Sequence, residues 1–199
     1  MSDLTELSTA RLRLRRWSRA DRVPFAAINQ DPHVIEFLPG PLSREQSDAM
    51  VDRIEAGFEE RGFGFWAVEV VDVASFIGFV GLSVPSFDAP FMPAVEVGWR
   101  LDHAYWGRGY ATEAAQASLR FGFDVLGLSE IVSFTTENNV RSRRVMERIG
   151  MTRDPADDFE HPGLAADSPL RRHVLYRVCH SEVRDAAAQQ AHRADGQER

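Results

Sequence analysis

Residues 104–115, AYWGRGYATEAA, decide the fold because they mark a change from extended to helical sequence. Gly107 and Gly109 stand just before an alanine-rich segment that is predicted to be helical over residues 111–123. The strand-like run AVEVGWRL precedes this segment, and the strand-like run SEIVSFTT follows it. A strand, a crossover helix and a second strand predict one parallel pair within the sheet.

The N-terminal half adds a strand, two helices and a hairpin. TARLRLRRW alternates leucine with arginine, as a half-buried strand does. A short helix capped by Ser18 is expected to stop at Asp31-Pro32. Ser43 and Gln46 have the spacing of a capping box, which begins a helix ending near Gly62. GFWAVEVV and ASFIGFVGLSV predict a hairpin.

The C-terminal part returns to strands after one more helix. NNVRSRRVMERIG predicts a helix with Asn139 as its cap and Gly150 as its stop. MTRDPADDFEHP and RRHVLYRVCH predict the last two strands. The order β-α-α-β-β-β-α-β-α-β-β indicates a single α/β (α+β) domain over residues 1–180. The polar segment 181–199 is expected to be a disordered or helical tail.

Composition narrows the class of protein. The chain has 199 residues and a formal net charge of -7, and all 23 basic residues are arginine. An acidic balance argues against a nucleic-acid partner, whose binding proteins present a basic face, and suits a cationic one such as an amine. The single cysteine, Cys179, fits a reducing compartment. With no signal-like or bilayer-length apolar run, a cytoplasmic protein without membrane contact is expected.

The two glycines before the helix suit an anion site. The first turn of a helix carries N–H groups without intrahelical partners and a partial positive charge. Glycine lets such a backbone approach a phosphate closely. The dinucleotide pattern G-x-G-x-x-G and the P-loop pattern G-x-x-x-x-G-K-[ST] are both missing. From spacing alone, an ordinary tight strand-to-helix connection fits equally well.

WGRGYATEA after VEVGWRLDHAY, with NNVRSRRVMERIGM downstream, resembles the GNAT superfamily of acyl-CoA N-acyltransferases. Within it, the chain looks most like the ribosomal-protein N-acetyltransferases of RimJ/RimL type, from TARLRLRRW to HVLYRV. The resemblance implies the GNAT fold: a mixed, mostly antiparallel central sheet with one parallel splayed pair and helices on both faces. It also implies acetyl-CoA as co-substrate and a homodimer. No histidine spacing typical of metal ligands occurs, so no metal is expected.

The resemblance assigns the coenzyme to three segments. The family loop [QR]-x-x-G-x-[GA] falls on residues 106–111, with Trp106 in place of Gln or Arg. The residues implied for the diphosphate are Trp106, Gly107, Arg108, Gly109, Tyr110, Ala111 and Thr112. The main chain of Trp99, Arg100 and Leu101 would border the pantetheine arm, with one N–H polarising the thioester carbonyl. Asn139 would order the arm, and Ser142 would be the general acid.

Structural alternatives stand beside the catalytic assignments. Asn139 and Ser142 also suit an ordinary helix cap and first turn. Glu96 alternates with Val95 and Val97, so it points to the opposite face and is the candidate base; the alternative is a solvated strand face. The candidate acceptor pocket comprises Trp17, Phe37, Trp66, His161, Arg171, His173 and Tyr176. The aromatic residues of this set also suit a plain core.

The expected activity is transfer of acetyl from acetyl-CoA to a primary amine by direct attack, without an acyl-enzyme. A protein or peptide N-terminal α-amino group is the acceptor that the resemblance favours. Its pKa of ~7.7–8.0 leaves it partly neutral, unlike a lysine amine at ~10.4. A small-molecule amine, antibiotic-like or polyamine-like, is the alternative acceptor. A catalytically silent CoA-binding module is an alternative of another class.

Overall fold

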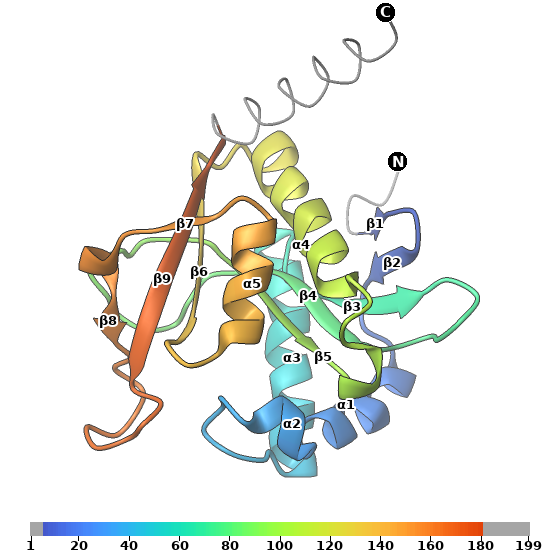
Figure 1. The fold of residues 1–199 in the computed structure, drawn as a ribbon. Helices are drawn as coiled ribbons and strands as arrows, with labels where there is room; N and C mark the ends of the chain where they lie inside the picture. The colour runs from blue at the N-terminus through green and yellow to red at the C-terminus, as the bar shows by residue number, and fades with distance from the viewer. Residues whose placement is uncertain (1–5, 181–199) are drawn as a thin grey trace, which may run out of the picture.

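Helices cover both faces of one mixed sheet (Figure 1). The structure, a computed structural model, describes residues 6–180, so the predicted tail at 181–199 lies outside the described residues. The nine strands follow the order β1-β2-β3-β4-β5-β6-β9-β7, and β8 pairs with β9. Within residues 6–180 no helix has the length and apolar character that crossing a membrane requires.

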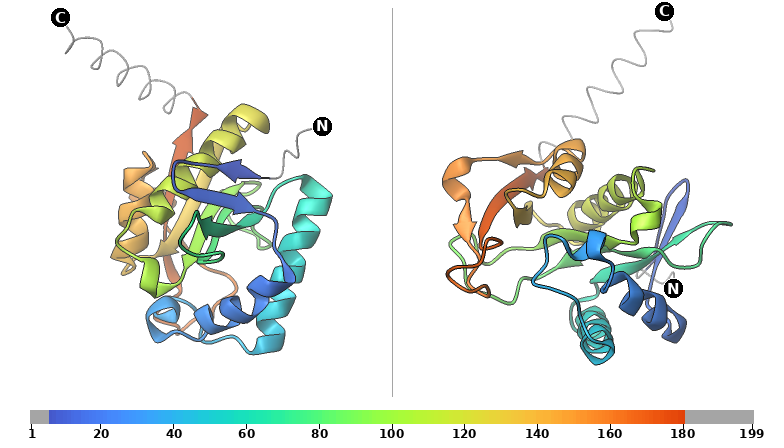
Figure 2. Two further views of the ribbon diagram at one scale, coloured as in Figure 1. Left: turned by 90° about the vertical axis from the view of Figure 1, so that its right-hand side faces the viewer. Right: turned by 60° about the horizontal axis from the view of Figure 1, so that its bottom comes forward.

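The strands and helices have the following bounds. The strands are β1 Leu7–Ser8, β2 Leu12–Arg15, β3 Phe65–Val70, β4 Gly78–Ser83, β5 Glu96–Leu101, β6 Glu130–Thr136, β7 Thr152–Arg153, β8 Phe159–Glu160 and β9 Arg172–Cys179. The α-helices are α1 Arg22–Ile28, α2 Pro32–Ile35, α3 Arg44–Arg61, α4 Tyr110–Arg120 and α5 Val140–Arg148. Figure 2 shows α4 and α5 on one side of the sheet and α1, α2 and α3 on the other.

The predicted parallel pair is β5 and β6. Their register contains the one Cα pair Glu96–Val132, where the N–H of Val132 donates to the carbonyl of Val95 at 2.9 Å. Beyond this point the two strands separate, whereas all other pairings among the described strands are antiparallel. The crossover through α4 makes the pair parallel, and the mixed, mostly antiparallel GNAT sheet is confirmed.

Side chains of β5 alternate between the two helical layers. Val97 and Leu101 are buried in the core that α4 covers. Arg100 contacts Asn29, at the end of α1, and therefore points to the opposite face. By the same alternation Glu96 and Gly98 share the face of Arg100.

Gly98 explains why β5 carries a glycine in its interior. A Cβ at this position would stand 3.1 Å from the ring of Phe65 on β3. The missing side chain therefore makes room for an aromatic ring on the α1–α3 face.

Helix boundaries follow the predicted caps, with one addition. Ser43 Oγ accepts from the N–H of Gln46 at 3.2 Å, and α3 ends at Gly62 with a φ of 76°. The first helix stops before Asp31-Pro32 as expected, since α1 ends at Ile28. Asp31-Pro32 also begins the short α2, which was not predicted, because Asp31 Oδ1 accepts from the N–H of His33 at 2.8 Å. Proline needs no hydrogen-bond acceptor at the first helical position, so it starts a helix as readily as it ends one.

Trp17 and Trp66 belong to the core and do not line an acceptor pocket, which corrects the expectation for both. Trp66 has no exposed surface and lies 5.3 Å from the ring of Phe121. Trp17 Nε1 donates to the carbonyl of Phe65 at 2.7 Å, and its ring is 5.0 Å from that of Phe25. Burial of large apolar rings between sheet and helices outweighs any use of them at the surface.

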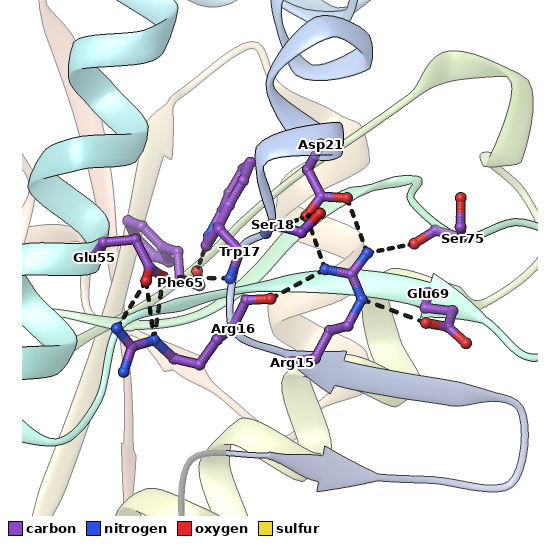
Figure 3. Close-up of polar contacts among 9 residues, drawn as sticks. All are labelled: Arg15, Arg16, Trp17, Ser18, Asp21, Glu55, Phe65, Glu69 and Ser75. Carbon is purple, nitrogen blue, oxygen red and sulfur yellow. Dashed lines mark hydrogen bonds and ion pairs between the residues drawn. The ribbon is translucent and has the colours of Figure 1, made fainter.

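Arginine–carboxylate pairs fasten the N-terminal strand to the helices beside it (Figure 3). Arg15 binds both oxygens of Asp21, at 2.8 and 2.9 Å, and reaches Glu69 at 3.3 Å. Arg16 binds Glu55 on α3 at 2.7 Å. Burial alone would raise the pKa of Asp21, but hydrogen bonds from Arg15 and from Ser18 lower it. In this layer each of the two arginines has a carboxylate partner.

Candidate active site

A cavity of about 460 Å³ lies where β5 and α4 meet α5 and α2. Every residue implied for coenzyme binding except Arg108 lines it: Trp99, Arg100, Leu101, Trp106, Gly107, Gly109, Tyr110, Ala111, Thr112, Asn139 and Ser142. The guanidinium of Arg108 lies over the ring of Tyr105, 5.7 Å from its centre, outside the lining. Folding therefore brings three separate segments together at one site.

The glycine loop exposes backbone donors to this cavity. Gly107 and Gly109 have φ angles of 74° and 82°, a left-handed conformation that glycine adopts without strain. Gly109 is the N-cap of α4, and no side chain caps this helix. The first N–H groups of α4 are thus free to bind an anion, and a Cβ at Gly107 would meet nothing within 4 Å. This geometry fits the diphosphate of coenzyme A.

The N-terminal strand region clamps the loop in place. Arg11 Nη1 donates to the carbonyl of Arg108 at 3.1 Å. Glu113, in the first turn of α4, accepts from Arg11 Nε at 2.7 Å and from Thr9 Oγ1 at 2.6 Å. The clamp could not be predicted from the sequence, because about a hundred residues separate the N-terminal strand region from the loop and neither segment suggests the contact.

The cavity is positively charged in an otherwise acidic protein. Its lining contains Arg100, Arg141, Arg144 and Arg148, and no aspartate or glutamate among the described residues. Arg144 and Arg148 lie on α5, facing the glycine loop across the cavity. Such a lining attracts an anionic ligand and raises its local concentration.

Arg141 ties α2 to the wall of the cavity. It forms an ion pair with Glu36, and its guanidinium lies 5.5 Å from the ring centre of Phe37 and 4.9 Å from that of Trp106. Phe37, predicted to contact the acceptor, does line the cavity. The ion pair joins the N-terminal turn of α5 to the end of α2.

Two N–H donors orient the hydroxyl of Ser142. Trp99 Nε1 donates to Ser142 Oγ at 3.3 Å, and Asn139 Nδ2 donates to it at 3.2 Å. Because both partners donate, the hydroxyl keeps its own hydrogen available for a third group. Asn139 Oδ1 also accepts from the N–H of Ser142 at 3.2 Å, so the same asparagine caps α5. The role of the Trp99 side chain was not predicted.

Glu96 lies where β5 and β6 begin to separate, outside the residues that line the cavity. Its side chain is half-buried, and burial raises the pKa of this carboxyl to about 7. A carboxyl with that pKa exchanges protons near neutral pH, which is the property that a general base requires.

The backbone of β5 presents Trp99 to the opening beside it. The carbonyl of Val95 binds β6, so alternate residues, including Val97 and Trp99, direct their backbone groups to the same side. Arg100 directs its backbone groups toward β4, with Phe79 as its Cα partner. Of the three residues expected to border the pantetheine arm, Trp99 and Leu101 therefore direct their N–H groups to the opening, and Arg100 does not.

Four further residues predicted for the acceptor pocket lie outside the cavity lining. Tyr176 is buried beneath α5, where its hydroxyl donates to Glu147 at 3.1 Å. Arg171 forms an ion pair with Glu160 at 3.2 Å. His161 and His173 lie 5.0 Å apart in an aromatic cluster with Phe87, Phe91, Phe134 and Phe159. Nothing in the sequence indicates which face of β9 His173 and Tyr176 would occupy.

Asp31, His33 and His103 are the described residues whose side chains could hold a metal ion. Their ligand atoms all lie within 4.8 Å of one another at the exposed rim. His33 Nδ1 is 3.0 Å from Asp31 Oδ1, and the two imidazole rings stack at 4.1 Å. The trio joins α2 to the turn after β5, an arrangement that sequence spacing did not reveal.

Together these features form a cavity for an anionic ligand at the uncapped N-terminus of α4, beside two separating strands. Comparison with known proteins agrees. The model of the acetyltransferase (GNAT) domain matches residues 11–152. The chain therefore belongs to the GNAT family, and it is an acyl-CoA-dependent N-acyltransferase.

One sequence relative and two solved structures of the same fold are similar to this chain. The FsC-acetyl coenzyme A-N(2)-transacetylase of Aspergillus fumigatus is 30% identical over 153 residues, covering 73% of this chain and 64% of that protein. The ribosomal-protein-S5-alanine acetyltransferase of Vibrio fischeri has a TM-score of 0.69 at 17% identity, over 88% of this chain and 96% of that one. The spermidine N-acetyltransferase of Vibrio cholerae, solved with CoA and spermine, has a TM-score of 0.68 at 15% identity, over 88% and 99%.

Proposed function

We propose that the protein transfers acetyl from acetyl-CoA directly to a primary amine while both substrates are bound. The observation that carries this proposal is the shared cavity, which joins uncapped N–H groups of α4 to the oriented hydroxyl of Ser142. Acetyl-CoA supplies a thioester that is already activated, so the enzyme's task is to position two substrates.

The coenzyme binds along α4, β5 and α5. The N–H groups of Tyr110, Ala111 and Thr112 hold the diphosphate, and Arg144 and Arg148 add positive charge from α5. The pantetheine arm runs in the opening between β5 and β6. There the N–H of Trp99 donates to the thioester carbonyl, where negative charge grows during the reaction.

Two proton transfers complete the reaction. The amine nitrogen forms a bond to the acetyl carbon, and the carbon–sulfur bond of the thioester breaks. Glu96 accepts the proton that the amine loses, through a water molecule, and its raised pKa suits this role. Ser142 donates its hydrogen to the departing sulfur, and Trp99 and Asn139 hold the hydroxyl in the required direction.

The acceptor that the sequence resemblance favours is a protein or peptide N-terminal α-amino group, as in the ribosomal-protein group. An α-amino group with a pKa of ~7.7–8.0 is partly neutral at pH 7 and needs only a weak base. A small-molecule amine is the second candidate, because the cavity of about 460 Å³ is of a size that suits a small ligand. The presence of both Glu96 and Ser142 argues against a silent CoA-binding module.

Release of CoA from acetyl-CoA, measured with a thiol reagent against peptide N-termini and small amines, tests the proposal. We expect release that depends on the amine, with kcat lowered ~100-fold by Ser142→Ala, the scale of one proton-transfer catalyst. An exposed serine, Ser86, changed to alanine is the matched control. Acetyl-CoA that raises the melting temperature but releases no CoA with any amine would support the silent module instead.

A further inference from the structure

Arg100 places a positive charge in the cavity wall beside the reacting groups. Its side chain is half-buried and lines the cavity. Nη1 donates to Asn29 Oδ1 at 2.6 Å and approaches Met50 Sδ at 3.8 Å. The guanidinium also lies 5.6 Å from the ring centre of Phe79. All of these partners are neutral, and they use only part of the five N–H donors of the group.

Within residues 6–180, Arg100 has no carboxylate partner at ion-pair distance, and burial lowers its pKa to about 10. The arginines in the neighbouring layer behave differently. Arg15, with 15% of its side chain exposed, binds both Asp21 and Glu69 (Figure 3). A cation taken out of water without an anion costs stability, so an unmatched one in a ligand cavity indicates that a ligand supplies the anion.

The diphosphate of coenzyme A does not account for this charge. Trp99 and Leu101, on either side of Arg100, face α5 and the core under α4. Arg100 faces the other layer, where it meets the end of α1. The coenzyme is assigned to the side of Trp99, so the anion that Arg100 would bind belongs to the second substrate.

Arg100 and the candidate base share one face of β5. Glu96 and Arg100 are four residues apart, with Gly98 between them, so their Cα atoms are separated by ~13 Å of strand. Both side chains extend from that face, and each is long enough to shorten the gap by several ångströms. The ring of Phe65 covers Gly98 between them, so an acceptor whose amine lies at Glu96 would pass over this ring to bring a second group to Arg100.

From this arrangement we infer that the acceptor is a small amine that also carries a carboxylate, such as a free amino acid or an ω-amino acid, with Arg100 binding the carboxylate. The inference rests on the proposed function, since it names the substrate class of the same site. A guanidinium and a carboxylate form paired, charge-assisted hydrogen bonds, which fix the amine relative to the thioester.

Matched acceptors that differ only in charge test the inference. CoA release is measured with glycine, L-alanine, β-alanine, γ-aminobutyrate and ε-aminocaproate, each against its own carboxamide. We expect kcat/KM for at least one acid to exceed that of its amide ~10- to 100-fold, the size of a hydrogen bond to a charged group. For the α-amino acids, amine basicity alone would favour the amide over the acid. The α-amino group of the amide is less basic, so a larger fraction of it is neutral and able to attack.

Arg100→Met distinguishes carboxylate binding from a purely structural role. If Arg100 binds the carboxylate, the acid-to-amide ratio falls to near one through a higher KM for the acid. Arg100→Lys, which keeps a charge, restores part of the ratio. If Arg100 only braces Asn29, both acceptors lose activity equally and the ratio survives, which overturns the inference. Arg53→Met, an exposed arginine on α3, is the control and leaves the ratio unchanged.

The remaining outcomes separate this inference from the proposed function. Amides or peptides turned over as fast as, or faster than, every acid by the wild-type enzyme would refute the inference and leave the acetyltransferase assignment standing. A lack of CoA release with every amine would refute both.

Discussion

Replacement of Glu96 by glutamine is predicted to stabilise the protein in a pH-dependent way. Burial raises the pKa of Glu96 from 4.5 to about 7, so the folded state binds this proton more tightly than the unfolded state. The wild-type protein therefore loses stability as pH rises from 4.5 to about 7, and the loss is complete above that range. Glutamine has the same shape and no charge, so Glu96→Gln does not incur this loss.

The size of the effect follows from the two pKa values. At ~1.36 kcal/mol per pKa unit, the buried carboxylate costs about 3 kcal/mol at pH 8 and about 1 kcal/mol at pH 5. Solvent contact of the half-buried side chain lowers both figures, so they are upper bounds. For a domain of this size, about 3 kcal/mol corresponds to a melting temperature ~6–12 °C higher for Glu96→Gln at pH 8.

Scanning calorimetry of both proteins between pH 5 and pH 8 measures this difference. Glu60→Gln, at a side chain that is 72% exposed, is the matched control and shows no gap that grows with pH. A melting-temperature gap between wild type and Glu96→Gln that stays constant from pH 5 to pH 8 would refute the reasoning.

Three further outcomes follow from the same geometry. Trp99→Phe removes one donor to Ser142 and lowers kcat ~3- to 10-fold in steady-state assays; an unchanged kcat would remove Trp99 as a positioning residue. Gly109→Ala forces a side chain into a φ of 82°, so the Kd for CoA by calorimetry rises ~5- to 30-fold, and an unchanged Kd would contradict the role of the loop. The pH profile of kcat/KM has an inflection near the Glu96 pKa of about 7, and this inflection is missing in Glu96→Gln. An inflection that persists in Glu96→Gln would assign the titration to another group.

The fold was largely predictable from local signals. The capping box at Ser43, the glycine stop at Gly62 and the crossover around Gly109 each have a short-range physical cause, and the structure contains all three. Asp31-Pro32 correctly marked the end of the first helix, but α2 after it was missed because its start depends on the capping hydrogen bond to the Asp31 side chain. The α-helical part of α4 ends at Arg120 and continues as a π-helical turn, for which the sequence has no clear signal.

The site was predictable only where a motif carried it. The glycine loop and the spacing of Asn139 and Ser142 placed the coenzyme residues in one cavity. The acceptor residues were assigned from residue type and from a general resemblance of the C-terminal segment to the subgroup. Most of them lie elsewhere, because neither signal reveals which way a side chain points. The unmatched charge of Arg100 and the clamp by Arg11 depend on contacts between distant segments.

The account depends most on the uncapped N–H groups of α4 as the binding site for the diphosphate. A crystal structure of the protein with CoA tests this directly. We expect diphosphate oxygens within ~2.7–3.2 Å of the backbone nitrogens of Tyr110, Ala111 or Thr112, the normal range for such hydrogen bonds. A diphosphate bound elsewhere, with those nitrogens contacting only solvent, would contradict the account.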